Sequence, residues 1–306
     1  MKPLRDKLIP TNRFSNIVIM CSCIFFFSCS AKQENSTKQR ATEQVSDSTT
    51  QENKGQNEWE TLFNGNDIQD WYVKINHHEV GENFGNTFRV EDGILKVRYD
   101  EYGEFNDQFG HLYYKKPYSY FHLKVEYRFV EDGWQKDAPE YTIKNSGIMF
   151  HSQDPRTMLV DQDWPISVEF QLLAGLEEGK ERPTGNMCSP GTDVVYNGEV
   201  DPRHCINSSS KTYYGDQWIT AELIVLGDSL VTHLINGDTV LQYSQPQIGG
   251  GVVNNYDPTL KVDGKLLNEG FIALQSEGQE IDFRKVEILD LTACMDTLSG
   301  SFENCY

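Results

Sequence analysis

The stretch VEFQLL, residues 168–173, combines an acid and an amide with the alternation of a strand. Successive side chains of a strand point to opposite faces, so its apolar residues predict a core face and leave Glu169 and Gln171 together on the other face. A carboxyl group can transfer a proton, and an amide can hold a polar oxygen. The pair therefore has the chemistry of a general acid–base site.

Two further predicted strands add polar groups. In SGIMFH (146–151) the apolar residues claim the core, which predicts that His151 faces outward. In QEIDFRKVEIL (279–289) the same reasoning turns Arg284 outward. If these strands share a sheet with Glu169, then an acid, an amide, an imidazole and a guanidinium converge, and either Glu169 or His151 could serve as a general base.

Other residues are expected to border this site. Trp164 stands just before VEFQLL, and its indole face suits the apolar C–H side of a pyranose ring. Gln275, in the predicted strand FIALQS, and Lys211, beside an irregular segment, are the remaining candidates for substrate binding. No metal-binding spacing accompanies these residues, and we expect neither a metal nor a cofactor.

The elements that must position these residues are strands. From residue 59 to residue 291 the pattern has a period of two and is broken by Gly, Asn and Asp turns. The segment 218–243 reads as three strands joined by GD and NGD turns. The pattern predicts an all-β protein, an antiparallel double-sheet jelly-roll sandwich. The irregular segments 174–216 and 244–265 are predicted insertions.

The N-terminus predicts export. Residues 1–28 have a basic start and a short apolar stretch, and FFSCS resembles a lipobox with cleavage before Cys29. We expect acylation of Cys29 and a lipid anchor in the cell envelope; a simple secretory signal or an uncleaved anchor are the alternatives. Residues 29–57 are polar and predict a disordered tether, 58–291 the globular domain and 292–306 a tail.

Four cysteines follow the predicted anchor. Pairing Cys188 with Cys205 and Cys294 with Cys305 closes two short loops and is the simplest of three connectivities. An exported protein can hold such disulfides, although free thiols are the alternative. No CxxC spacing predicts a zinc site.

The formal net charge of −19 argues against several partners. A strongly acidic chain repels phosphate backbones and other polyanions, so we do not expect nucleic acid or a polyanionic sugar as a partner. Neutral or cationic ligands remain, and the sequence does not indicate an oligomeric state.

Taken as a set and in order, several segments resemble the family of 3-keto-disaccharide hydrolases, formerly a domain of unknown function. The resemblance covers 58–291 and rests on ETLFNGNDIQDWYV (60–73), NTFRVEDGILKV (86–97), NSGIMFHS (145–152), ISVEFQLL (166–173), TGNMCSPGTDVV (184–195), CINSSSKTYYGDQWITAEL (205–223), THLINGDTV (232–240) and GFIALQSEGQEIDFRKVEIL (270–289). Two positions depart from the family pattern: His151 stands where an Arg is common, and Ser276-Glu277-Gly278 replaces a common His-Gly.

The resemblance implies a concanavalin A-like jelly roll, a lipoprotein and action on 3-keto-glycosides. A ketone at C3 acidifies the hydrogen on C2, so a base can remove that proton and the C1 substituent leaves; water then adds to the glycal. Glu169 or His151 would be the base, and Arg284 or Gln171 would bind the enolate or a hydroxyl. The alternative is a glycan-binding lipoprotein without catalysis. A retaining glycosidase of this fold needs an ExDxxE strand, which is absent from the sequence.

Overall fold

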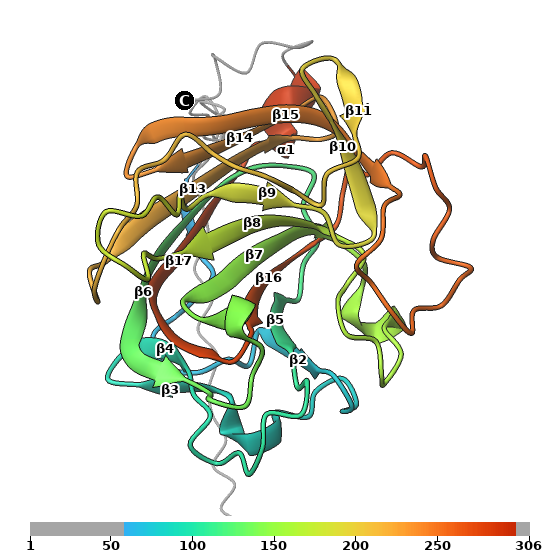
Figure 1. Ribbon diagram of the computed structural model, residues 1–306. Coiled ribbons are helices and arrows are strands. Elements are labelled where there is room, and N and C mark those ends of the chain that lie inside the picture. Colours follow the sequence, from blue (N-terminus) through green and yellow to red (C-terminus); the bar gives the residue numbers. More distant parts are fainter. Residues whose placement is uncertain (1–57, 298–306) are drawn as a thin grey trace, which may run out of the picture. The chain divides into compact units, whose positions relative to one another are not determined.

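The computed structural model describes residues 58–297, which form two stacked antiparallel sheets (Figure 1). In the ten-stranded sheet the order is β11-β10-β15-β14-β13-β6-β17-β4-β3, and β1 pairs with β17. Its strands are β1 (Glu60–Thr61), β3 (Phe88–Glu91), β4 (Ile94–Val97), β6 (Tyr120–Trp134), β10 (Thr192–Tyr196), β11 (Glu199–Asp201), β13 (Ile219–Leu226), β14 (Leu230–Ile235), β15 (Asp238–Ile248) and β17 (Gln279–Asp290).

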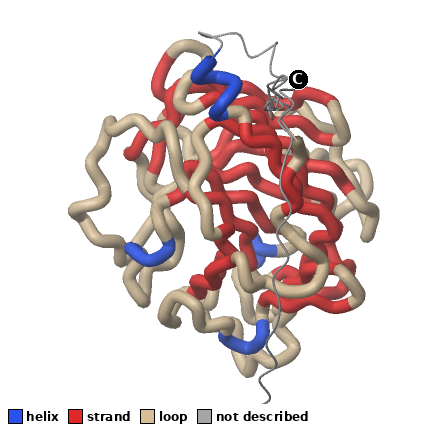
Figure 2. Tube along the Cα trace, turned by 180° about the vertical axis from the view of Figure 1, so that it is seen from behind, coloured by secondary structure: helices blue, strands red, loops and turns tan. Residues whose placement is uncertain are grey.

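The seven-stranded sheet has the order β12-β9-β8-β7-β16-β5-β2. Its strands are β2 (Trp71–Ile75), β5 (Gly110–Tyr114), β7 (Asn145–Ser152), β8 (Val168–Leu173), β9 (Asn186–Cys188), β12 (Cys205–Ile206) and β16 (Phe271–Ser276). Helical pieces are short and lie around the strands (Figure 2): η1 (Phe84–Asn86), η2 (Glu140–Thr142), η3 (Pro155–Thr157) and α1 (Thr292–Thr297). The predicted jelly-roll sandwich is confirmed. No helix among the described residues is long and apolar enough to cross a membrane.

The core lies between the two sheets and follows the alternation of the sequence. Leu123 and Val125 of β6 are fully buried, as are Phe150 of β7 and Phe170 of β8. Burying each large apolar side chain contributes roughly 1.5–3 kcal/mol, so this alternation fixes which face of each strand turns outward. On β8 the outward face carries Glu169, as the sequence predicts.

The face of the seven-stranded sheet that points away from the core, here called the open face, is partly covered by the segment 153–167. The buried Lys74 of β2 donates from Nζ to the carbonyl of Val160 over 2.8 Å, and Tyr113 of β5 donates to the sulfur of Met158 over 3.2 Å. Burial lowers the pKa of Lys74 to about 8. These contacts hold the segment that carries Trp164.

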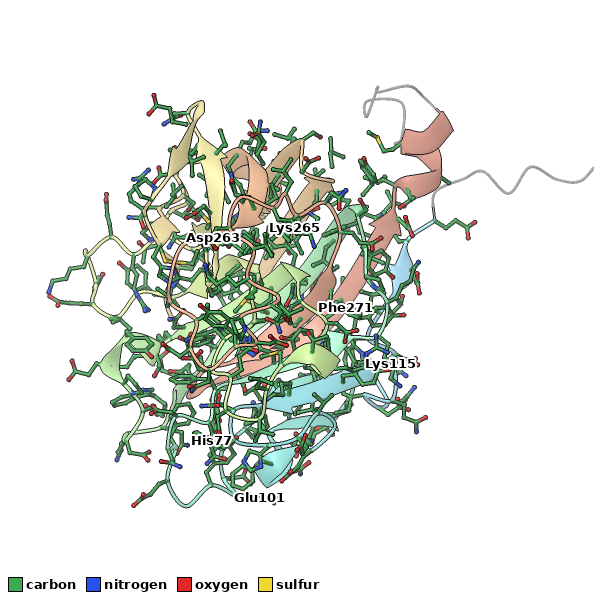
Figure 3. All side chains as sticks on the ribbon, turned by 90° about the vertical axis from the view of Figure 1, so that its right-hand side faces the viewer. His77, Glu101, Lys115, Asp263, Lys265 and Phe271 are labelled. Atoms are coloured by element: carbon green, nitrogen blue, oxygen red, sulfur yellow. A yellow bond between two sulfur atoms is a disulfide. The ribbon has the colours of Figure 1, made fainter. Side chains whose placement is uncertain are left out.

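A second segment, between β15 and β16, borders the same face. Figure 3 shows Asp263 and Lys265 on this segment. Its Asn254 donates from the backbone and from the side chain to the carboxylate of Asp163, over 2.8 and 2.6 Å. The predicted insertion 244–265 therefore binds the segment that precedes β8.

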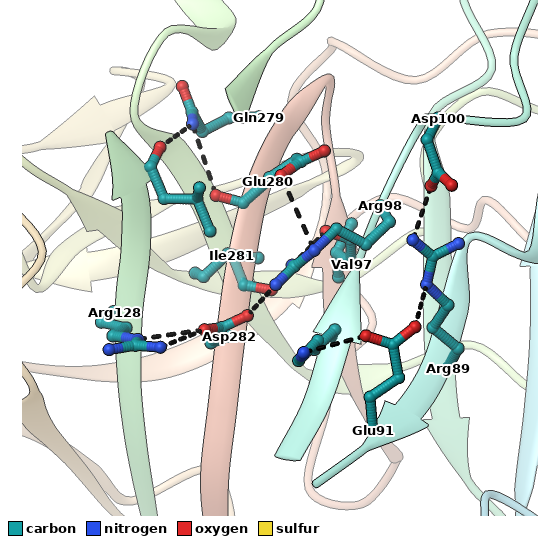
Figure 4. A network of polar contacts seen from close by, with 12 residues as sticks. Arg89, Glu91, Val97, Arg98, Asp100, Arg128, Gln279, Glu280, Ile281 and Asp282 are labelled. Carbon is teal, nitrogen blue, oxygen red and sulfur yellow. Dashed lines mark hydrogen bonds and ion pairs between the residues drawn. The ribbon is translucent and has the colours of Figure 1, made fainter. Parts of the chain in front are cut away.

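The outer face of the ten-stranded sheet carries a separate network of ion pairs (Figure 4). Asp282 of β17 accepts hydrogen bonds from Arg98 over 2.5 Å and from Arg128 over 3.0 Å. Arg284 lies on the same strand, pairs with Glu126 and stacks on Trp218. The predicted convergence of Arg284 with Glu169 is therefore wrong, because the two residues lie on different sheets.

The Cys188–Cys205 disulfide joins β9 to β12 and confirms the first predicted pair. The second pair includes Cys305, which lies outside the described residues, as do Cys29 and the predicted signal and tether segments. These remain predictions.

Replacing both Cys188 and Cys205 by Ser is expected to lower the free energy of unfolding by about 3 kcal/mol, because the bridge spans a sequence separation of 17 and restricts the unfolded chain. Denaturant unfolding of the two proteins measures the difference. Under a strong reductant the difference should vanish; a difference that persists would show that the loss comes from packing of the serines instead.

Candidate active site

A cavity of about 460 Å³ opens on the open face of the seven-stranded sheet. Strands β7, β8 and β9 form its floor, and segments that follow or precede strands form its walls. It is lined by Tyr141, Asn145, Trp164, Glu169, Gln171, Leu173, Arg182, Cys188, Pro190, His204, Cys205, Val252 and Glu277. The structure thus brings together three of the sequence-predicted site residues, Trp164, Glu169 and Gln171.

A glycine determines where the carboxyl group of Glu169 lies. In the strand register, Gly147 of β7 stands opposite Gln171, two positions along from the pair Met149–Glu169 and therefore on the same face. A Cβ atom at Gly147 would lie only 2.4 Å from Oε1 of Glu169 and 2.8 Å from its Cγ. The Glu169 side chain therefore folds over the bare backbone of the neighbouring strand.

Glu277 is a second buried carboxyl group in this cavity. It follows β16 and precedes Gly278, which turns the chain with a φ of 89°. Its Oε2 has no hydrogen-bond partner among the described residues. Such a buried, unpaired oxygen is unfavourable unless a proton or a ligand compensates it, so Glu277 points to a functional site.

The two carboxyl groups influence each other. Burial raises the pKa of Glu169 to about 8. Burial, and then the charge of Glu169, raise the pKa of Glu277 well above its usual range, while the positive charge of Arg182 opposes this. Near neutral pH the pair therefore holds protons that exposed carboxyl groups would have lost, and one member can give a proton while the other takes one.

Arg182 supplies the positive charge of the cavity wall. Its Nη1 donates to the carbonyls of Lys144 and Ala174 over 3.1 and 2.6 Å. Burial lowers its pKa, and the negative charge of Glu277 raises it. A guanidinium held by two carbonyls stays fixed beside the carboxyl pair, where it can stabilise developing negative charge.

Gln171 is oriented by its neighbours. Its Oε1 accepts a hydrogen bond from Nδ2 of Asn186 over 3.1 Å, and Oδ1 of Asn186 accepts from the backbone of Ser208 over 2.9 Å. This chain of bonds fixes the amide so that its NH₂ group is the end left to donate to a ligand.

Trp164 forms a wall of the cavity and is partly exposed. Its ring packs against Phe109 at a centroid distance of 4.8 Å and edge-on against His111 at 5.6 Å. The indole is thus held in one orientation, as a stacking platform requires.

His151 lies elsewhere, although it belongs to β7. The pairing of β7 with β16 shifts register next to it, and its φ is 46°. Its Nε2 donates to the carbonyl of Gly227, at the turn between β13 and β14 of the other sheet, and burial lowers its pKa to about 4. The prediction that His151 faces the same side as Glu169 is wrong because this bulge reverses the alternation.

Two other predicted residues do not line the cavity. Gln275 lies on the open face next to it, since it pairs in register with His111 of β5, and its Oε1 is buried and without a partner among the described residues. Lys211 borders a different groove, lined by residues 179–181, 183, 208–212 and 214. Its Nζ lies 5.0 Å from the centre of the Tyr213 ring.

His204 and the Cys188–Cys205 bridge form one wall, and their nitrogen and sulfur atoms lie within 4.8 Å of one another. The two sulfurs are bonded to each other, so they do not provide the thiolates that a metal ion would need. The bridge instead braces β9 beside Glu169, which pairs in register with Cys188.

The sequence interpretation missed Glu277 and Arg182 as site residues. Glu277 carried one signal, because it stands where the family commonly has a histidine. Arg182 lies in the irregular segment 174–216 and had no periodic signal. Tyr141 and Asn145 stand just before or at the start of β7, where alternation says little about direction.

Comparison with known proteins identifies the family. Residues 58–289 match the 3-keto-alpha-glucoside-1,2-lyase-like domain. The chain belongs to this family. The match spans most of the chain and both sheets, and it supports a carbohydrate-related function. No match is found among curated proteins.

Several solved structures align with this chain at low identity. Two proteins of Parabacteroides distasonis named as candidate glycosyl hydrolases each align over 76% of this chain. The first has 21% identity and a TM-score of 0.46, and the alignment covers 94% of its own chain. The second has 18% identity and a TM-score of 0.45, and the alignment covers 98% of its own chain. The carbohydrate-binding module CBM66 from Bacillus subtilis aligns over 71% of this chain and 93% of its own, with 11% identity and a TM-score of 0.40.

Proposed function

We propose that this protein cleaves the glycosidic bond of 3-keto-glycosides by elimination followed by hydration. The observation that carries the proposal is the buried pair Glu169 and Glu277, whose pKa values are both raised, inside a cavity with an aromatic wall. Membership of the family supports the choice of a 3-keto-glycoside as substrate. A pair of carboxyl groups with displaced pKa values is what a reaction with one proton taken and one proton given requires.

The two carboxyl groups divide the work in the first step. The ionised form of Glu169, which becomes the main form above its pKa of about 8, takes the proton from C2, which the C3 ketone has acidified. The C2–H electron pair forms the C1=C2 double bond, and the C1–O bond breaks. The leaving oxygen takes a proton from Glu277, which retains its proton because its pKa is raised well above the usual range.

The second step reverses the proton movements. Water adds across the double bond, its hydroxyl group to C1, and Glu277 takes the proton that water loses. Between the two steps the carboxyl proton of Glu169 exchanges with solvent, and Glu169 then gives a solvent-derived proton to C2. The pair is thereby restored, and the net result is hydrolysis.

The developing enolate needs donors. The NH₂ group of Gln171 and the guanidinium of Arg182 are the donors that the cavity wall offers for the C3 oxygen. Donors fixed in advance stabilise such an oxyanion without reorganisation, which is worth about 3 kcal/mol for one donor.

The proposal is tested with purified full-length protein and 3-keto-trehalose in D₂O, with trehalose as the matched substrate that lacks the ketone. Free glucose should appear only from the keto sugar, and mass spectrometry should find deuterium at C2 of the 3-keto product. Glucose release without deuterium at C2 would show direct hydrolysis. Binding without any release would favour the other candidate, a glycan-binding protein, for which Trp164 and Tyr141 suffice.

We further propose that the protein is anchored in the cell envelope by a lipid on Cys29. The lipobox-like stretch before Cys29 supports this location. Cells that express the Cys29→Ala variant should lose label from radioactive palmitate, whereas the unchanged protein should carry it; labelling of the variant would overturn the proposal.

A further inference from the structure

The rim of the cavity carries an exposed aromatic ring that the proton chemistry does not use. Tyr141 is 56% exposed and lines the cavity. On the same rim, from a distant part of the sequence, Val252 is also exposed. Exposed apolar side chains around a cavity that contains polar groups indicate a place where the apolar face of a ligand binds.

Tyr141 is presented by a rigid turn. It lies at the centre of η2, where Thr142 is fully buried, and Nε1 of Trp134 donates to Oγ1 of Thr142 over 3.0 Å. The carbonyl of Tyr141 accepts a hydrogen bond from Nδ2 of Asn145 over 3.2 Å. An exposed ring on a fixed backbone binds at a low entropic cost, because only its own side-chain torsions need ordering.

Acidic groups from three segments act electrostatically on the phenol of Tyr141. Partial burial and then the charges of Glu277, Asp107 and Asp163 raise the pKa of Tyr141 to about 12. These three acids lie in the segments before β5, before β8 and after β16. The exposed ring offers an apolar face for stacking, and the negative charge of the acids disfavours an anionic ligand at this rim.

We infer that Tyr141 forms the subsite for the leaving sugar, a neutral pyranose that stacks on its ring. This rests on the proposed function, because the 3-keto ring must lie inside the cavity, between Trp164 and the pair Glu169 and Glu277. A second ring joined through C1 then extends outward to the rim. The subsite would favour glycosides with a neutral sugar as the leaving group over those with a uronic acid.

Two substrates distinguish binding of the leaving sugar at this subsite from reaction of the 3-keto ring. 3-Keto-trehalose has a pyranose leaving group, whereas methyl 3-keto-α-glucoside has the same reacting ring and no second sugar. Tyr141→Ala should lower kcat/KM for the disaccharide roughly tenfold and change that for the methyl glycoside less than about twofold. Tyr141→Phe should restore the disaccharide rate, because stacking needs the ring and not the hydroxyl group.

Trp59→Ala is the control, because Trp59 is an exposed aromatic residue that packs on His122 of the other sheet. It should leave both substrates unaffected. Equal losses for both substrates in Tyr141→Ala would overturn the inference and make Tyr141 a structural residue, and an unchanged disaccharide rate would overturn it too.

Binding distinguishes failure of this inference from failure of the proposed function. If the unchanged protein cleaves neither keto sugar, the chemistry is wrong, and calorimetric titration with trehalose and with methyl α-glucoside still tests the subsite. The unchanged protein should bind the disaccharide more tightly, and Tyr141→Ala should remove that preference. The same affinity for both sugars in both proteins would overturn the subsite.

Discussion

Glu169→Gln is expected to abolish turnover and to stabilise the folded protein above neutral pH. The amide has nearly the same shape as the carboxyl group but cannot take the C2 proton, so kcat should fall by about 10³-fold, within the range that general base catalysis supplies. The amide also has no charge to desolvate. Removing a buried ionisable group therefore improves stability while it removes function.

The sign of the pH dependence follows from the direction of the pKa shift. Burial raises the pKa of Glu169 from 4.5 to about 8. Between these values the folded protein holds a proton that the unfolded chain has lost, so this group's contribution to stability is present below pH 4.5 and is lost as pH rises to 8. The Glu169→Gln variant does not lose this contribution as pH rises, because its amide does not titrate. Its advantage in unfolding free energy should be near zero at pH 4.5 and on the order of 4 kcal/mol at pH 8.

Denaturant unfolding at several pH values measures the difference in unfolding free energy between the variant and the unchanged protein. The glucose-release assay measures turnover of the same two proteins. Glu178→Gln is the matched control, because Glu178 is exposed and does not line the cavity. It should change neither turnover nor the pH dependence of stability. A Glu169→Gln variant that is less stable than the unchanged protein at pH 8 would show that the carboxylate has a structural partner and is not a desolvated base.

The alternation of the sequence was enough to predict the sheets and the outward face of β8. The alternate residues Val168, Phe170 and Leu172 belong to the core between the sheets. Glu169 and Gln171 therefore lie where the pattern places them, on the face that carries the cavity. Trp164 precedes this strand directly and shares its cavity. Short-range information thus determines three residues of the site.

The position of His151 could not be predicted from the alternation of apolar and polar residues. A bulge reverses its direction, and the bulge depends on close packing with Gly270 of a distant segment, where a Cβ atom would lie 2.4 Å from the backbone carbon of His151. Neither the bulge nor the close approach has a signature within SGIMFH. A single extra residue in one strand is therefore enough to remove a side chain from the site.

Arg284 and Glu277 show a second limit. Alternation gives the face of a strand but not the sheet to which the strand belongs, and Arg284 lies on the ten-stranded sheet. Glu277 follows a strand at a turn, and only the packing of distant segments makes it buried. The raised pKa values come from this burial, so the proton chemistry of the pair is a tertiary property.

Gly147→Ala is expected to lower kcat by about 100-fold while the fold is retained. The added Cβ would lie 2.4 Å from Oε1 of Glu169, so the carboxyl group must move away from its place above β7. A displacement of about 1 Å at a catalytic group can reduce the rate to this extent. Alanine fits an ordinary strand, so the free energy of unfolding should change by less than about 1 kcal/mol.

Combining Gly147→Ala with Glu169→Gln tests whether the loss of turnover in Gly147→Ala comes from displacement of the Glu169 carboxyl group. In the Glu169→Gln background, Gly147→Ala should lower turnover no further, because the base whose position it disturbs is already gone. Gly103→Ala is the control, since a Cβ at Gly103 would meet nothing within 4 Å. Wild-type turnover in Gly147→Ala would mean that the position of the Glu169 carboxyl group above β7 is not needed, and the base would have to be sought in Glu277, the other carboxyl group of the cavity.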